Sequence, residues 1–126
     1  LQGTVSGSFT NYSTTFGGWN VTANNVDLQG TWQDRSPSGG RSVDLTGSWT
    51  LGTISQSITT VSGNWYAVRF MLSTGYDGAN SATMELTAGN NVQNFTVNTT
   101  TGHDTDANAQ WYEQTYLFQA NSSSTL

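Results

Sequence analysis

Three aromatic side chains in turn-rich parts of the sequence are the residues best suited to binding a ligand. Trp32, Trp49 and Tyr76 fall at the ends of predicted strands or in loops. A flat aromatic face in such a place can stack on the apolar C–H face of a sugar ring. The alternative is a half-buried aromatic at a sheet edge. Trp19 and Trp65 lie within strand patterns and are predicted to be core residues.

An acidic run is the candidate for a metal site. Asp104, Asp106 and Asn108 carry side-chain oxygens at alternating positions. Oxygen ligands are what a hard cation such as Ca²⁺ prefers. The spacing predicts a calcium ion there as a candidate cofactor. The alternative is a solvated acidic turn, because Ala109 stands where the EF-hand loop has glycine and no glutamate closes the loop.

Two further polar residues could act as functional groups. Arg41 is a candidate ligand-binding cation, although it could instead pair with Asp27 or Asp34. His103 is the single histidine, and no nucleophile motif accompanies it, so a surface histidine is the simpler interpretation. No pair among the eight carboxylates stands out for glycoside hydrolysis. The sequence therefore predicts no catalytic residues and no turnover of common polysaccharides.

Asn-x-Ser/Thr motifs make several asparagines candidates for glycosylation. The five positions are Asn11, Asn20, Asn94, Asn98 and Asn121. Five such motifs are close to the number expected by chance in a chain so rich in asparagine, serine and threonine. The positions of the asparagines within the predicted strands are therefore the better evidence. Asn20, Asn94 and Asn98 alternate with apolar neighbours in predicted strands, and strand alternation should point all three to solvent.

The composition and net charge argue against some classes of binding partner. Only 9% of residues are charged, lysine and cysteine are absent, and the net charge is −5. Nucleic acids and anionic membranes need basic patches, so neither is expected as a partner. No apolar run approaches the ~18 residues of a membrane span, so no membrane insertion is expected. A neutral, hydroxyl-rich surface is typical of extracellular or cell-surface β-proteins.

Alternation of apolar and polar residues predicts an all-β fold. The clearest case is 65–73, where Tyr66, Val68, Phe70 and Leu72 share one face. With turn residues between them, the strands recur about every ten residues, which favours one antiparallel two-sheet β-sandwich, a jelly roll, spanning residues 1–126. The other predicted strands are 4–9, 19–22, 26–31, 41–45, 53–59, 82–88, 92–98 and 114–120. The run 122–125 is predicted to be a loop or tail.

Several short segments, in order, resemble a known family over roughly residues 5–126. They are Gly7-Ser-Phe9, Gly18-Trp19, Val26-Asp-Leu28 with Gly30-Thr-Trp-Gln33, Arg41-Ser-Val-Asp-Leu45 with Gly47, Gly52-Thr-Ile-Ser-Gln56, and Trp111 with Thr115-Tyr-Leu-Phe118. Their order and spacing resemble the choice-of-anchor C domains of bacterial surface proteins. Those domains are similar to plant cell-wall proteins of the galactose-binding-like jelly-roll class. The resemblance implies a non-catalytic extracellular module, often near polysaccharide.

Such domains usually continue with another strand and a Leu-Asp-Asn-Val-like segment, whereas this sequence stops at Leu126. A sandwich that lacks this final strand is expected to expose the edge of 116–120. The unpaired backbone groups of an exposed sheet edge can form hydrogen bonds with a strand of another chain. We therefore expect association through sheet edges with another copy or another chain, with residues 1–6 as a candidate donor strand.

Two hypotheses of function follow. The first is a non-catalytic module that binds glycan or matrix polysaccharide. The second is a glycosylated structural subunit of an extracellular filament or surface layer, assembled through sheet edges. Loss of glycan binding on Trp32→Ala would favour the first, and concentration-dependent polymers would favour the second.

Overall fold

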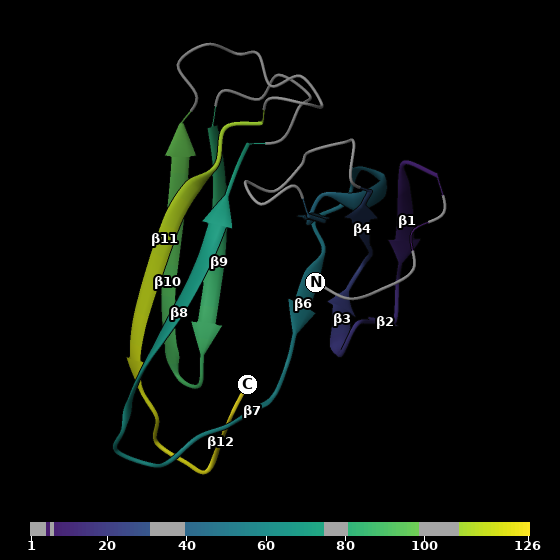
Figure 1. Ribbon diagram of the computed structural model, residues 1–126. Helices are drawn as coiled ribbons and strands as arrows, with labels where there is room; N and C mark the ends of the chain where they lie inside the picture. Colours follow the sequence, from purple (N-terminus) through teal and green to yellow (C-terminus); the bar gives the residue numbers. More distant parts are fainter. Residues whose placement is uncertain (1–4, 6, 31–39, 75–80, 99–108) are drawn as a thin grey trace.

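The computed structural model describes residues 5, 7–30, 40–74, 81–98 and 109–126, and within them the chain is all-β (Figure 1). Every strand pairing there is antiparallel, which confirms the predicted antiparallel β-sandwich class. The elements are β1 (Phe9–Tyr12), β2 (Thr15–Phe16), β3 (Trp19–Ala23), β4 (Val26–Gln29), β5 (Val43–Asp44), η1 (Gly47–Trp49), β6 (Thr53–Ser55), β7 (Ile58–Thr59), β8 (Trp65–Leu72), β9 (Ser81–Ala88), β10 (Asn91–Asn98), β11 (Tyr112–Gln119) and β12 (Ser124–Thr125).

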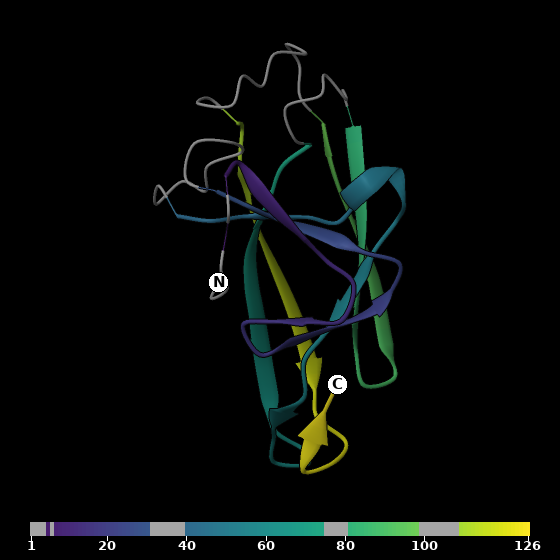
Figure 2. The ribbon, with the colours of Figure 1, turned by 90° about the vertical axis from the view of Figure 1, so that its right-hand side faces the viewer.

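The four long strands form two hairpin-like ribbons. β8 pairs with β11 from Trp65↔Gln119 to Leu72↔Tyr112, and β9 pairs with β10 around a tight turn at Gly89, whose φ is +59°. Exposure alternates along β8 and β9, as the period of two requires. Figure 2 shows the two ribbons side by side, with β11 next to β10.

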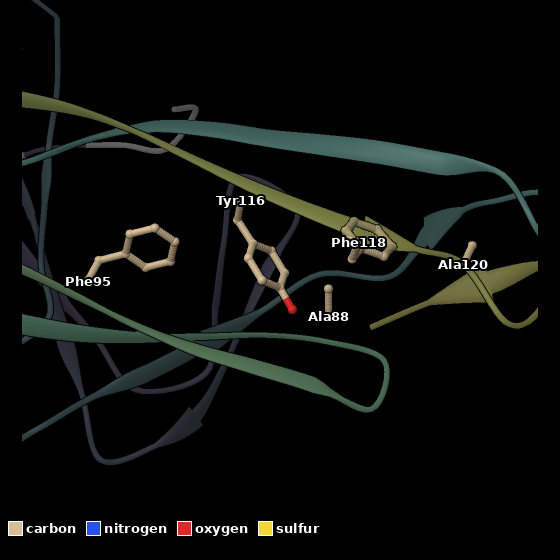
Figure 3. Close-up of a cluster of buried hydrophobic side chains, with 5 residues drawn as sticks. All are labelled: Ala88, Phe95, Tyr116, Phe118 and Ala120. Carbon is tan, nitrogen blue, oxygen red and sulfur yellow. The ribbon is translucent and has the colours of Figure 1, made fainter.

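Aromatic side chains fill the space between the two ribbons. The C-terminal cluster consists of the buried residues Ala88, Phe95, Tyr116, Phe118 and Ala120 (Figure 3). Phe95 of β10 meets Phe70 of β8 edge to face, with ring centroids 5.1 Å apart, and meets Tyr116 at 6.3 Å. These contacts connect the two ribbons, in agreement with the predicted inward face of 65–73.

The N-terminal strands enclose a hydrophobic cluster of their own. Strands β1, β4 and β5 form one sheet in the order β1-β4-β5, and β2, β3 and β6 form another in the order β2-β3-β6. Between them lies the N-terminal cluster of Phe16, Val26 and Leu28, with Trp19 and Val21 packed against it. In Figure 1 these strands stand to one side of the long ribbons.

The last residues are part of the sheet structure, which corrects the prediction of a loop or tail at 122–125. Ser124 and Thr125 pair with β7, and Thr125 is buried. The Thr125 hydroxyl lies 3.1 Å from the Thr60 hydroxyl, which donates to the Ser122 carbonyl at 2.8 Å. These contacts join segments about sixty residues apart, a distance over which local sequence pattern carries no signal.

Other strand boundaries also differ from the sequence prediction. The first strand begins at Phe9, where the predicted 4–9 strand ends. The predicted 53–59 strand is two strands, β6 and β7, separated at Gln56 and Ser57. The two-residue strand β2 was not predicted, because two residues are too few to show a period.

Candidate functional site

Trp49 projects from the molecule almost fully, with 95% of its surface exposed. It belongs to a segment from Gly47 to Gly52, here called the Trp49 loop, which follows β5 and contains η1. Leu51 in the same loop is also exposed. Large exposed apolar side chains that lie close together mark surfaces that contact ligands.

The backbone of the Trp49 loop adopts an uncommon conformation. Ser48 and Trp49 both have left-handed backbone angles, with φ of 49° and 66°. Each such residue costs on the order of 1–3 kcal/mol and persists only where the surroundings enforce it. Three backbone bonds enforce it here: Trp49 donates to Thr46 at 3.0 Å, Thr50 to Gly47 at 3.2 Å, and Gly52 to Leu45 at 2.6 Å.

Polar side chains from neighbouring strands fix the loop from outside. The Asn24 amide donates to the Leu51 carbonyl at 2.7 Å, and the Asn25 amide donates to the Thr50 hydroxyl at 3.3 Å. At the start of the loop, Asp44 accepts bonds from the Thr46 backbone and hydroxyl at 2.7 and 2.6 Å. The loop is therefore held from the β3–β4 turn and from β5.

Two glycines let the loop approach the buried strand β4. A Cβ atom on Gly47 would lie 2.8 Å from the Val26 backbone, and one on Gly52 would lie 2.6 Å from the Val26 side chain. Real Cβ atoms essentially never approach other heavy atoms this closely. The Trp49 loop is thus packed directly onto the N-terminal cluster, and Trp49 stands on a rigid base.

A buried carboxylate lies beneath this arrangement. Asp27 on β4 is buried and accepts a hydrogen bond from the Asn11 amide at 2.6 Å. The same Asn11 nitrogen lies 2.8 Å from the Asn25 side-chain oxygen and 3.3 Å from the Ser48 hydroxyl. Asp27 and Asn11 therefore act as part of the support for the loop.

The structure places two of the predicted ligand-binding residues. Trp49 lies outside the strands, as predicted, and is exposed, whereas Arg41 is half-buried in the segment that leads into β5. In the described part of the chain, no three histidine or acidic side chains gather as a metal site would require. The other predicted site residues lie outside the described residues: Trp32, Tyr76, Asp104, Asp106 and Asn108.

Trp65 is exposed, which corrects the prediction that it is a core residue. It is 68% exposed at the first position of β8. The physical reason is register: Tyr66, Val68 and Phe70 point inward, so Trp65 must point outward. The alternation of the residues over 65–73 already indicates that Trp65 lies on the face opposite Tyr66, Val68 and Phe70. Trp19, by contrast, packs against the N-terminal cluster as predicted.

All five candidate glycosylation asparagines are exposed, but they differ in their surroundings. The Asn11 side-chain nitrogen already donates to Asp27 and Asn25. A glycan attaches to that same nitrogen, so glycosylation of Asn11 would disturb the support of the Trp49 loop.

We predict that native material carries a glycan on at least one of Asn20, Asn94 and Asn98, and none on Asn11. The reason is that the first three side chains face solvent on strands, while the Asn11 amide is engaged. Glycopeptide mass spectrometry of the native protein checks both parts. Bare peptides at all three strand positions, or a glycan on Asn11, would contradict the prediction.

Sequence comparison assigns the chain to a family. A family model described as a protein of unknown function, DUF642, matches residues 3–126. The chain belongs to the DUF642 family. DUF642 proteins are associated with plant cell walls, which confirms that part of the resemblance. No curated protein and no solved structure gives a significant match to this DUF642 chain. Among its described residues, no helix has the length and apolar character to cross a membrane.

Proposed function

We propose that this DUF642 protein is a non-catalytic extracellular module that binds polysaccharide through the Trp49 loop. The observation that carries the proposal is Trp49 itself: a nearly fully exposed indole on a backbone that hydrogen bonds and packing hold in one strained conformation. A binding platform fixed before the ligand arrives loses little entropy on binding.

The chemistry around Trp49 suits a neutral sugar. The indole face can stack on the C–H groups of a pyranose ring. Ser48, Thr50 and Asn24 are exposed residues in or beside the loop, and their side-chain oxygens can accept hydrogen bonds from sugar hydroxyls. The net charge of −5 disfavours polyanions, so neutral wall polysaccharides are the proposed ligands over acidic ones.

Localisation and family relations beyond DUF642 are part of the same proposal. The association of the family with plant cell walls supports an extracellular location. The similarity to choice-of-anchor C domains of bacterial surface proteins, proposed from the sequence, fits the same kind of role. The proposed absence of catalysis rests on the site, where Asp27 and Asp44 support backbone and side-chain contacts of the loop.

The test is Trp49→Ala in affinity electrophoresis against neutral polysaccharides such as xyloglucan, β-glucan and mannan, with polygalacturonate as the acidic comparison. We expect binding to a neutral polymer to weaken roughly tenfold or more, equivalent to about 1.4 kcal/mol. Stability should change by less than about 0.5 kcal/mol, because the side chain is exposed.

Trp65→Ala is the matched control, since it removes another exposed indole from a different surface. It should leave the affinity unchanged. Equal binding by wild type and Trp49→Ala would refute the proposed site. No retention of any neutral polysaccharide by wild type would refute the proposed ligand class.

A further inference from the structure

The ribbon of β8 and β11 has one face that stays exposed. Every second residue of each strand points to this face, because the side chains of a strand alternate between its two sides. The eight residues concerned are all exposed, and we call them the outer face. They form four cross-strand pairs: Trp65 with Gln119, Ala67 with Leu117, Arg69 with Thr115, and Met71 with Glu113.

The remaining side chains of the two strands lie on the opposite face. Tyr116 and Phe118 of β11 belong to the C-terminal cluster, and Tyr66, Val68 and Phe70 of β8 pack against that cluster. The outer face therefore points away from the C-terminal cluster. In Figure 1, β11 lies at the side of the molecule opposite β1.

Large apolar side chains are exposed at one end of the outer face. Trp65 and Leu117 are each more than half exposed. Both line a groove of about 450 Å³ together with Val92 of β10, which is also exposed. The apolar part of the outer face thus continues onto the neighbouring strand. Apolar side chains that gather on a surface in this way mark sites of protein contact.

The shape of the outer face is complementary to itself. Leu117, which projects from the ribbon, lies directly opposite the small side chain of Ala67. Consider two copies whose outer faces meet about a twofold axis that runs along the strands, between β8 and β11. Such an isologous contact brings the same patch of both copies together. It lays β11 of each copy over β8 of the other, so each Leu117 fills the space above the partner's Ala67.

The charges of the outer face also suit a second copy of the same chain. Arg69 is the single cation among the eight residues and Glu113 is the single anion. The face is therefore neutral, although the whole chain carries a net charge of −5. With β11 over the partner's β8, Glu113 lies one cross-strand pair away from the partner's Arg69. Long side chains can reach across such a diagonal and form an ion pair.

We propose that the outer face of the β8–β11 ribbon is a self-association surface, on which a second copy of this chain packs face to face about that twofold axis. Burial of Leu117 and Trp65 drives the contact, and the neutral charge of the face permits it. This inference is independent of polysaccharide binding, because the Trp49 loop packs on the N-terminal cluster.

The first test is light scattering coupled to size-exclusion chromatography over a dilution series of wild type and Leu117→Lys. Protein without glycans is used, because the candidate glycosylation site Asn94 lies on the neighbouring strand β10. Lysine at the exposed Leu117 should leave the fold intact and set like charges side by side in the dimer. We expect a wild-type dimer, and a dissociation constant raised roughly tenfold or more in Leu117→Lys.

Leu51→Lys is the matched control, since it places the same charge at an exposed leucine on the Trp49 loop. It should dimerise as wild type does. A wild-type monomer at every soluble concentration would overturn the proposal. Equal weakening by Leu51→Lys would also overturn it, because the effect would then come from net charge rather than from the outer face.

A mixing experiment tests the twofold axis itself. Leu117→Lys and Leu117→Glu should each be monomeric at concentrations where wild type is a dimer. The two variants mixed in equal amounts should form a heterodimer, because lysine on one copy then meets glutamate on the other. Failure of the mixture to dimerise would overturn the proposal, since Leu117 would then not face its own copy.

Discussion

Phe95→Ala is expected to lower the free energy of unfolding by about 3–5 kcal/mol. Phe95 is 6% exposed and contacts Phe70 and Tyr116, which lie on the opposite ribbon. Its removal leaves a cavity where the two ribbons meet, and the surrounding side chains can close it only partly. Proteins are stable by only about 5–15 kcal/mol, so the variant should approach the limit of folding.

Equilibrium unfolding in urea measures this loss, and Val92→Ala is the control. Val92 lies on the same strand but is exposed, so its truncation should cost less than about 0.5 kcal/mol. A loss below about 1 kcal/mol for Phe95→Ala would mean that the ribbons do not pack through this ring.

Gly52→Ala should destabilise the protein and also abolish binding through the Trp49 loop. The added methyl group would overlap the Asn25 carbonyl and the Val26 side chain. Overpacking of this kind costs about 1–3 kcal/mol. The strand β4 beneath is fully buried, so the loop must move, and Trp49 moves with it.

Gly63→Ala is the control that distinguishes the effect of a displaced Trp49 loop from the effect of lower stability. Gly63 has a φ of +86° with open space around it, so alanine there costs roughly 1–2 kcal/mol through the backbone alone. Both variants should show lower melting temperatures, while polysaccharide binding should be lost only in Gly52→Ala. Full binding by folded Gly52→Ala would show that contact with β4 does not position Trp49.

Sequence pattern predicted the long strands well because their alternation is strong. The predicted segments 82–88 and 92–98 match β9 and β10 to within one residue at each end, and 114–120 covers most of β11. Polar and apolar residues alternate along most of these segments, with Val92 and Leu117 as exceptions. The short strands β2, β5, β7 and β12 have two residues each, so their existence depends on partners that lie far away in the sequence.

The candidate site was predictable in part. The position of Trp49 after a strand marked it as a candidate, but its left-handed backbone is set by Asn24, Asn25 and Gly52, which act through the fold rather than through local sequence. Trp65 was misplaced because its position within a strand pattern was taken as a sign of burial, whatever its register. The register was the better guide, since a period of two assigns Trp65 to the face opposite Phe70.

The division of the molecule into two hydrophobic clusters has a consequence for protein engineering. The Trp49 loop packs on the N-terminal cluster, whereas Phe95 and its neighbours on the long ribbons form the C-terminal cluster. Substitutions in the C-terminal cluster can therefore change the free energy of unfolding while the base of Trp49 keeps its packing. Resistance to unfolding and affinity for sugar are then two properties that can be engineered one at a time.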